Sequence, residues 1–390
     1  MNTHSTLCWT LLCFATPAFL GQLLGCAKPV IIDQPNSDDG GTDLGTDGST
    51  NGLSVFSARL PDTFEFPSEY KPIPPEAQRY WKRDPHYLSV DGSKYLFIAG
   101  SDANRLNERW SLSFYKDPAM VSKTSGWALM FDGPSSTSWD KNDVMAPFVS
   151  FNVVDGWTTY YAASGDPTKP PWVFQIGRAV GIDLTKLARA PQPVIGTPAY
   201  TGDVPNTARP DAYGATDPWL FVDGGDTYMY YAGLDCATGS CKFQILRSKS
   251  PDGGKSFPPG EVVLSGRGVP EEAGGVAGPS VVKLGSQYLL AYTAVKDVPT
   301  KSLQSIRDAL SKATVGLAVS KDGKTFQPGT KTGGALVPRL AGITSYRSEG
   351  TSSPTLYVEN QTVYGWVSGR KDDSDGNYYG IVSMFLTENP

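Results

Sequence analysis

The stretch Asp84-Pro85-His86-Tyr87-Leu88 opens a short apolar run, and the same X-Pro start returns four more times along the chain. The later copies are Ala146-Pro147-Phe148-Val149, Asp217-Pro218-Trp219-Leu220-Phe221, Gly278-Pro279-Ser280-Val281-Val282 and Ser353-Pro354-Thr355-Leu356-Tyr357. A turn and a second strand rich in aromatic residues follow each copy. Proline is tolerated at the first residue of a strand, because no ladder hydrogen bond is lost there. We therefore expect each proline to mark the beginning of a strand, and the hairpin to be the repeating unit.

Third and fourth strands follow in most repeats, and an Asp-Gly turn separates them in the segments 243–257 and 316–326. Successive X-Pro pairs lie about 60 to 75 residues apart. Because closing such units into a ring removes exposed sheet edges, we predict an all-β fold. The expected domain is a five-bladed β-propeller over 54–390 with mostly four-stranded antiparallel blades, starting near 84, 146, 217, 278 and 353. One amphipathic helix is expected at 301–314, as an insertion in blade four.

The N-terminal part of the chain has the features of an export signal. Residues 1–25 contain no Asp, Glu, Lys or Arg, and 7–24 is apolar but too interrupted for a confident membrane span. The run Leu23-Leu24-Gly25-Cys26 resembles the lipobox of bacterial lipoproteins, which implies cleavage before Cys26 and lipidation of its thiol. The alternative is an ordinary cleaved signal peptide. Residues 26–53 are rich in Gly, Asp, Thr and Ser, and we expect a flexible tether.

The charge and the cysteine content of the chain limit which classes of partner and which cellular compartment are expected. The net charge is −5, and the five aspartates between residues 33 and 50 account for it, so the body is balanced. Without a basic stripe, nucleic acid is not an expected partner, and a neutral oligosaccharide or polysaccharide fits better. Cys236 and Cys241 are the only body cysteines, and in an exported chain they predict a disulfide, with two free thiols as the alternative. We expect a monomer held at the cell envelope, on the outer membrane or cell surface, by its lipid alone.

The X residues of the five X-Pro pairs are the first candidates for chemistry. In a propeller the innermost strands point at one axial funnel, so equivalent positions converge there. Asp84 and Asp217 therefore face one cavity, which His86 and Trp219 also line. Two or three carboxylates around a pocket are what glycoside hydrolysis needs, one to activate water and another to protonate the leaving oxygen. The alternative is that each Asp-Pro only begins a strand through a local hydrogen bond.

From residue 81 to about 369 the chain resembles the family 43 glycoside hydrolases and their relatives in the five-bladed arabinanase, invertase and levansucrase group. Arg83-Asp84-Pro85 is similar to the blade-one motif whose aspartate is the general base. Met145-Ala146-Pro147 resembles the Trp-Ala-Pro of blade two, and Thr216-Asp217-Pro218 the blade-three motif whose aspartate tunes the pKa of the acid. In that family blade four begins Glu-Gly-Pro and the glutamate is the general acid, but this chain reads Ala277-Gly278-Pro279.

The missing acid leaves other carboxylates to consider. Glu349, Glu272, Glu271 and Asp143 each precede an X-Pro pair by a few residues, so each could reach over the funnel from a loop. Glu349 and Glu272 are the first candidates. For each of them the alternative is a solvated loop charge. The aromatic rings near the blade starts offer flat surfaces to sugars, although such rings also pack between blades. The expected substrate-binding residues are His86, Trp219, Trp81, Trp139 and Arg347.

Two functions stay open at this point. One is an exported glycosidase for arabinan- or xylan-type chains, inverting, with Asp84 as base and Asp217 as modulator. The other is a surface glycan-binding lipoprotein that has lost its general acid but keeps the funnel. A different chemistry on the same ring is a third, weaker option. No cofactor is required, a structural Ca²⁺ is compatible with the oxygen-rich channel, and two histidines argue against zinc.

Overall fold

The computed structural model describes residues 53–59, 82–101, 110–116, 127–131, 139–140, 143–164, 174–196, 209–236, 239–330, 336, 350–373 and 376–389. The predicted signal segment, Cys26 and most of the predicted tether lie outside these residues. Among the described residues the regular structure is almost entirely β-strand, with one α-helix and a short 3-10 turn, η5 (Pro270–Glu272). No helix in this part of the chain is long and apolar enough to cross a bilayer.

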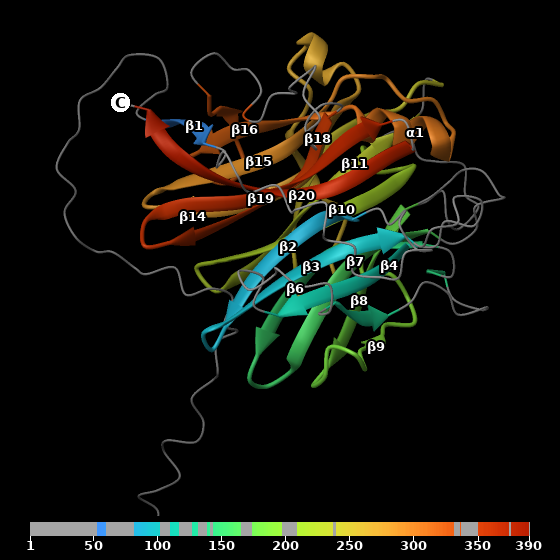
Figure 1. The fold of residues 1–390 in the computed structure, drawn as a ribbon, viewed down its shortest axis with the longest axis vertical. Coiled ribbons are helices and arrows are strands. Elements are labelled where there is room, and N and C mark those ends of the chain that lie inside the picture. The colour runs from blue at the N-terminus through green and yellow to red at the C-terminus, as the bar shows by residue number, and fades with distance from the viewer. Residues whose placement is uncertain are drawn as a thin grey trace, which may run out of the picture.

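The strands form five blades, four of which can be followed in Figure 1 by colour, from β2 in blue through β6 in green to β14 in orange and β18 in red. Blades three and four are joined into one eight-stranded sheet by a single parallel pair, Phe243 with Gly275. Blade one is β2 (Lys82–Val90), β3 (Ser93–Ser101), β4 (Trp110–Lys116) and β5 (Trp127–Phe131). Blade two is β6 (Asp143–Asn152), β7 (Gly156–Ser164), β8 (Phe174–Gly181) and β9 (Ala188–Arg189). Blade three is β10 (Gly214–Asp223), β11 (Asp226–Asp235), β12 (Lys242–Lys249) and β13 (Glu261–Leu264). Blade four is β14 (Gly275–Leu284), β15 (Gln287–Val295), β16 (Thr314–Ser320) and β17 (Gln327–Pro328). Neighbouring strands within each of these blades pair antiparallel, as predicted.

Blade five takes its outermost strand from the N-terminal side of the chain. Its first three strands are β18 (Gly350–Glu359), β19 (Thr362–Asp373) and β20 (Gly376–Asn389). The fourth is β1 (Val55–Arg59), which pairs antiparallel with β20. The Phe56 side chain is 3% exposed and lies in one cluster with residues of blades four and five, and its N–H donates to the Gly329 carbonyl at 2.8 Å. The ring is therefore closed by a strand that the repeat pattern did not predict.

The X-Pro pairs are not the first residues of their strands, which corrects the expectation from the sequence. Each pair is the third and fourth or the fourth and fifth residue of its innermost strand, where the ladder shifts register, for instance between Arg83 and His86. A bulge leaves its extra residue unpaired, so the missing proline N–H costs no ladder bond. All five X residues have a left-handed backbone, with φ between 48° and 54°. This conformation is costly outside glycine, so its fivefold recurrence marks a built feature.

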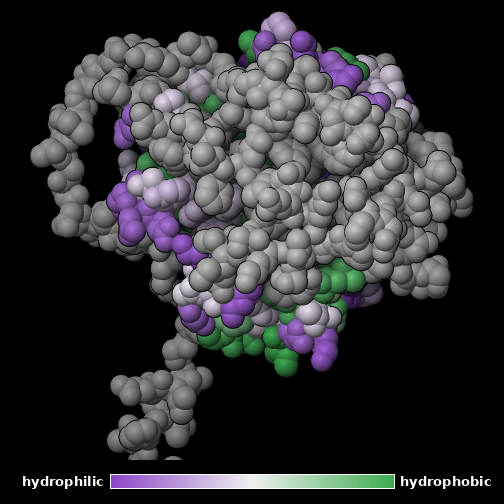
Figure 2. Space-filling view, viewed as in Figure 1, coloured by the Kyte–Doolittle hydropathy of each residue, from purple (hydrophilic) through white to green (hydrophobic). Residues whose placement is uncertain are grey.

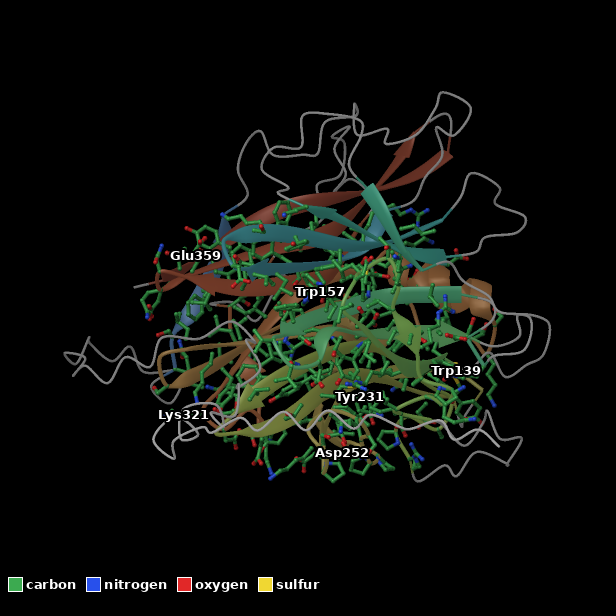
Figure 3. The ribbon with its side chains drawn as sticks, turned by 90° about the horizontal axis from the view of Figure 1, so that it is seen from below. Trp139, Trp157, Tyr231, Asp252, Lys321 and Glu359 are labelled. Carbon is green, nitrogen blue, oxygen red and sulfur yellow. A yellow bond between two sulfur atoms is a disulfide. The ribbon has the colours of Figure 1, made fainter. Side chains whose placement is uncertain are left out.

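Tyrosines of the second strands join neighbouring blades. The Tyr160 hydroxyl of blade two donates to the Gly254 carbonyl of blade three at 2.6 Å. In the same way the Tyr230 hydroxyl of blade three donates to the Gly323 carbonyl of blade four at 2.7 Å. Both glycines belong to the Asp-Gly turns after the third strands, whose aspartates accept backbone N–H groups. One of these aspartates, Asp252, lies at the edge of the molecule in Figure 3. The turns thus have a structural role.

The insertion in blade four is helix α1 (Leu303–Ser311), close to its predicted position. It begins at Ser302, whose side chain accepts a hydrogen bond from the Ser305 N–H at 3.1 Å. Ile306 and Ala309 face a buried cluster that also contains Cys236 and Cys241. These two cysteines form the predicted disulfide.

Exposed apolar side chains lie at one end of blade two. Val153 and Val154 in the β6–β7 turn are 68% and 73% exposed, and Ile182 after β8 is 92% exposed. Hydrophobic surface is visible at the lower edge of Figure 2, where Figure 1 shows the ends of the blade-two strands. Nothing in the described residues covers these three side chains.

Replacing Phe56 by alanine tests the closing strand. Deleting a buried phenyl group costs about 3 to 5 kcal/mol, so the F56A variant should unfold at clearly lower urea concentration than wild type. The exposed neighbour Ser57 gives the matched control, and S57A should stay within about 0.5 kcal/mol. Equal stability of F56A and S57A in urea titrations would show that β1 does not fasten the ring.

Candidate functional site

The X residues of the five blades lie together, as the repeat register predicted. Asp84 of blade one accepts a hydrogen bond from the Ala146 N–H of blade two at 3.3 Å and one from the Ser353 hydroxyl of blade five at 2.7 Å. Asp217 of blade three accepts from the Gly278 N–H of blade four. The Cα of Ser353 lies 3.5 Å from the place where a Cβ on Gly278 would be. These contacts link blades far apart in sequence, and we call the five residues the X ring.

Asp84 is the most firmly held member of the X ring. Its Oδ1 accepts from the Arg83 guanidinium at 3.0 Å as well as from Ser353, and it is 4% exposed. Its own N–H donates to the Ser368 hydroxyl at 2.9 Å, from the second strand of blade five. The ion pair with Arg83 and the additional donors hold the carboxylate in one orientation. The hydrogen bond on Oδ2 is long, and this oxygen retains a lone pair for a further donor.

The electrostatic environment of Asp217 favours the protonated carboxyl group. Burial of its carboxyl group, together with the negative charge of Asp84, raises the pKa of Asp217 to about 7. The Arg83 charge and hydrogen bonds from the Gly278 N–H and the Thr216 hydroxyl act in the other direction without cancelling the rise. Asp217 therefore keeps its proton to a clearly higher pH than an ordinary aspartate does. The X ring combines an ion-paired carboxylate with a carboxyl group that can donate a proton, which is the division of roles that acid–base catalysis uses.

His86 and Trp219 do not line an open site, contrary to the expectation. The His86 ring lies 4.5 Å from the Phe148 ring and 5.3 Å from the Trp219 ring, between the innermost strands of blades one to three. Burial lowers the pKa of His86 to about 4, although its hydrogen bond to the Val149 carbonyl opposes this, so the ring is neutral at pH 7. The Trp219 indole donates to the Val281 carbonyl of blade four at 2.8 Å. Both side chains fasten neighbouring blades.

Trp139 is also a packing residue. It is 5% exposed, stacks on Tyr161 with ring centroids 6.0 Å apart, and lies toward one edge of the molecule in Figure 3. Its ring lies so close to Gly177 that a Cβ there would come within 2.6 Å of it, so only glycine fits opposite this ring. Trp81, Arg347 and Glu349 lie outside the described residues, and their predicted roles stay predictions.

Glu272, a candidate for the general acid, is held in a structural contact instead. It is 3% exposed and accepts from the Tyr292 hydroxyl at 2.8 Å and the Arg267 guanidinium at 3.0 Å. Burial alone would raise the pKa of Glu272, but the hydrogen bonds from Arg267 outweigh it and lower the pKa below its usual value. A general acid needs a raised pKa. The structure therefore argues against Glu272 as the proton donor.

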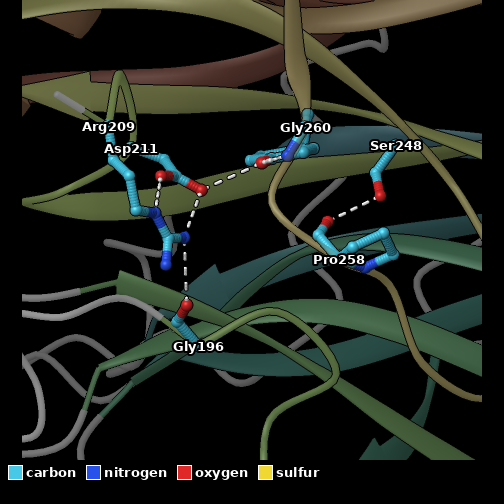
Figure 4. Close-up of polar contacts among 7 residues, drawn as sticks. Gly196, Arg209, Asp211, Ser248, Pro258 and Gly260 are labelled. Atoms are coloured by element: carbon cyan, nitrogen blue, oxygen red, sulfur yellow. Dashed lines mark hydrogen bonds and ion pairs between the residues drawn. The ribbon is translucent and has the colours of Figure 1, made fainter.

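The same contact recurs in the two preceding blades, which explains the position of Glu272. In each case the acid lies six residues before its X residue, and a tyrosine of the second strand and an arginine donate to it. The equivalents are Asp140 with Tyr161 and Arg189, and Asp211 with Tyr231 and Arg209. Figure 4 shows the Arg209–Asp211 pair. An acid at this offset is thus a feature of the blade and not of the X ring.

Ala277 stands where the resemblance places the acid of blade four. It is 0% exposed and packs in an apolar cluster with Leu234, Phe243 and Val295. No carboxylate is present at this position. For Asp143, only the backbone at the start of β6 is described, paired with Ser164. Glu271 is an exposed neighbour of Glu272 in η5.

Sequence reasoning missed the residues that hold Asp84 in place. The repeat places Ser353 among the X residues but gives it no role of its own, and it gives no sign of Ser368, because serine is common in strands of any blade. The strand register could have identified both serines. Ser353 is the X residue of blade five, and Ser368 pairs with its neighbour Ser352. Arg83 was read only as part of the motif, yet its position directly before Asp84 allows the ion pair across the bulge.

Two further features of the described residues bear on ligands. No group of three or more His, Cys, Asp or Glu side chains among them is close enough to hold a metal ion. A surface cavity of about 530 Å³ lies between β12 and the segment 265–275, with Glu272 in its wall. None of its lining residues belongs to the X ring, so this cavity is separate from the candidate site.

Replacing Glu272 by glutamine tests its structural role. The E272Q variant should lose about 2 to 3 kcal/mol at pH 7, because Arg267 loses its partner. Since folding lowers the pKa of Glu272, its contribution is complete above the usual value of 4.5 and is lost as the pH falls through the lower folded value. The difference between wild type and E272Q in urea titrations should therefore shrink on the acid side of 4.5, while the exposed control E271Q stays close to wild type throughout. A stable E272Q protein at pH 7 would contradict this role.

No protein-family model and no curated protein matches the chain. Solved structures do. A thermostable family-43 glycoside hydrolase has a TM-score of 0.52 at 15% identity, with 79% of this chain and 89% of that chain covered. The catalytic domain of a GH62 α-L-arabinofuranosidase from Coprinopsis cinerea has a TM-score of 0.53 at 11% identity, with 86% and 97% covered. The α-L-arabinofuranosidase of Podospora anserina, solved with cellotriose, has a TM-score of 0.52 at 12% identity, with 86% and 98% covered. At these identities the likeness establishes the fold: the chain has the five-bladed β-propeller of the family 43 and family 62 glycoside hydrolases.

Proposed function

We propose that this protein hydrolyses O-glycosidic bonds of an arabinan- or xylan-type oligosaccharide or polysaccharide, with inversion at the anomeric carbon. The observation that carries the proposal is that the two carboxyl groups of the X ring lie in different environments. Asp84 is ion-paired with Arg83, whereas the pKa of Asp217 is raised to about 7. The fold supports it, because the similar structures include arabinofuranosidases and a family-43 hydrolase. The complex of one of them with cellotriose also favours an oligosaccharide ligand.

Asp84 is the proposed general base. Its Oδ1 is occupied by Arg83 and Ser353, while Oδ2 has only the long hydrogen bond from Ala146 among the described contacts. A water donating to Oδ2 would be deprotonated as its oxygen attacks the anomeric carbon from the side opposite the leaving group. Arg83, Ser353 and Ser368 act as positioning residues, because they fix the orientation of the Asp84 carboxylate.

A non-catalytic glycan-binding protein is the second candidate, and Ala277 favours it. The buried methyl group cannot donate a proton where the related enzymes have a glutamate. Loss of a general acid costs about 10² to 10⁴ in rate, enough to leave only recognition. In this case the X ring would bind sugar hydroxyl groups through Asp84 and Asp217 and turn nothing over.

We further propose that the chain is exported and anchored to the cell envelope through Cys26, as a monomer. The lipobox-like Leu23-Leu24-Gly25-Cys26 supports the anchor. The Cys236–Cys241 disulfide fits an oxidising compartment, which is where such bonds persist.

Replacing Asp84 by asparagine should abolish hydrolysis if Asp84 activates the water. We expect D84N to lose about 10² to 10⁴ in kcat/KM on arabinan and xylan oligosaccharides, measured as reducing ends released. The control is D91N, an exposed aspartate in the turn after the same strand, and it should match wild type. NMR of the first-formed sugar should show inversion. Unchanged activity of D84N rules out Asp84 as base, and glycan binding by a wild-type protein that releases no sugar supports the second candidate.

Replacing Cys26 by serine tests the anchor. Wild-type protein expressed with radiolabelled palmitate should carry the label and partition with membranes, whereas C26S should be unlabelled and soluble after export. The C13S variant is the matched control, because Cys13 lies within the segment expected to be cleaved. Label retained in C26S would exclude the proposed lipidation site.

A further inference from the structure

The proposed hydrolysis needs a proton donor, and the described residues leave few choices. Ala277 brings no carboxyl group, and Glu272 is committed to Arg267 and Tyr292 with a lowered pKa. Asp84 is ion-paired and already serves as base. The remaining carboxyl group of the X ring is Asp217.

We infer that Asp217 is the general acid of this protein and donates its proton to the leaving glycosidic oxygen, so that two aspartates of the X ring carry out the reaction. This inference rests on the proposed glycosidase function. It gives Asp217 a role different from the modulator role that the family resemblance implies. The position of Ala277 is then a consequence: with the acid supplied from blade three, blade four no longer needs one.

The placement of Asp217 in the X ring is the first support. Blades one and three are not neighbours, so Asp84 and Asp217 are separated in the X ring by Ala146 on one side and by Gly278 and Ser353 on the other. All three intervening residues have small side chains. A sugar bound over the X ring would meet one carboxyl group from each of two non-adjacent blades, and an inverting reaction uses carboxyl groups on opposite sides of the scissile bond.

The contacts of Asp217 are the second support. The Gly278 N–H and the Thr216 hydroxyl both donate to its carboxyl group. Hydrogen bonds to the charged form stabilise the anion that remains after the proton has left. Arg83 acts in the same direction from blade one. Burial and the Asp84 charge keep the proton on Asp217 before the reaction, with a pKa of about 7.

The proton balance of the step is complete with these two residues and water. The bond between the anomeric carbon and the leaving oxygen breaks as Asp217 protonates that oxygen. The bond to the water oxygen forms on the opposite side, and the proton of the water goes to Asp84. After product release, Asp84 returns its proton to solvent and Asp217 takes one up, which restores the starting state.

The test compares D217N with wild type on a series of aryl glycosides whose leaving groups range from dinitrophenol to unactivated alcohols. A general acid matters little for a good leaving group, so D217N should lose less than about tenfold on the dinitrophenyl substrate but about 10² to 10⁴ on oligosaccharides. D84N should lose activity equally across the series, and the exposed control D91N none.

The pH profile gives a second readout in a protein that keeps both carboxylates. An acid must be protonated, so wild-type kcat/KM should fall as the pH rises through about 7, the pKa of Asp217. The T216V variant removes one donor to the anion and should move this alkaline limb to higher pH. In D217N on the dinitrophenyl substrate the limb should disappear.

Three outcomes overturn the inference and each is distinct. An equal loss of D217N activity for all leaving groups with an intact alkaline limb makes Asp217 a positioning residue. Leaving-group dependence in E349Q instead of D217N identifies Glu349 as the acid. A wild-type protein without turnover on any substrate in the series refutes the hydrolase proposal itself, and the inference with it.

Discussion

The left-handed bulge at each X-Pro pair is the constraint on which the rest of the structure depends. It turns the X side chain out of the ladder without ending the innermost strand, and it does so in all five blades with nearly the same φ. The strands on either side of it still pack between blades. Because the bulge is repeated, residues separated by a whole blade in sequence meet in one ring, and Asp84 can contact Ala146 and Ser353. The repeated bulge, and not any single loop, therefore brings the candidate catalytic residues together.

Hydrogen bonds from side chains at equivalent positions of the strands hold neighbouring blades together. Just after the bulges, His86 and Trp219 bond to carbonyl groups of the next blade, and Ser280 accepts the Leu356 N–H of blade five. Farther out, tyrosine hydroxyls reach the Asp-Gly turns of the following blade. Each of these donors obtains an acceptor across a blade boundary, so burial between the blades does not cost it a hydrogen bond. Four of the aromatic residues in the described part of the chain, His86, Trp219, Tyr160 and Tyr230, are used in this way.

The sequence predicted the fold and the ring of X residues well, because both follow from a repeat that can be counted. It predicted the individual roles of the surrounding residues poorly. His86, Trp139 and Trp219 looked like sugar-binding residues, since a one-dimensional pattern does not say which face of a strand is covered by the next blade. Glu272 was a candidate for the missing general acid, although Asp140 and Asp211 also lie six residues before the X residue of their blades. Comparing the columns before and after the X position would have revealed that structural acid. The closing strand β1 has no X-Pro mark, so nothing in the repeat pointed to it.

The closing strand also orders events during synthesis. β1 is made before any blade, yet its partner β20 is the last strand of the described chain. Contacts between such distant segments form slowly, because the whole intervening chain must be arranged first. Until then the edge of β20 carries unpaired backbone groups, which invite pairing with other chains. If the proposed export takes place N-terminus first, β1 would reach the far side of the membrane before β20 has been made. The ring would stay open during that interval, and protection from aggregation would have to come from outside the propeller.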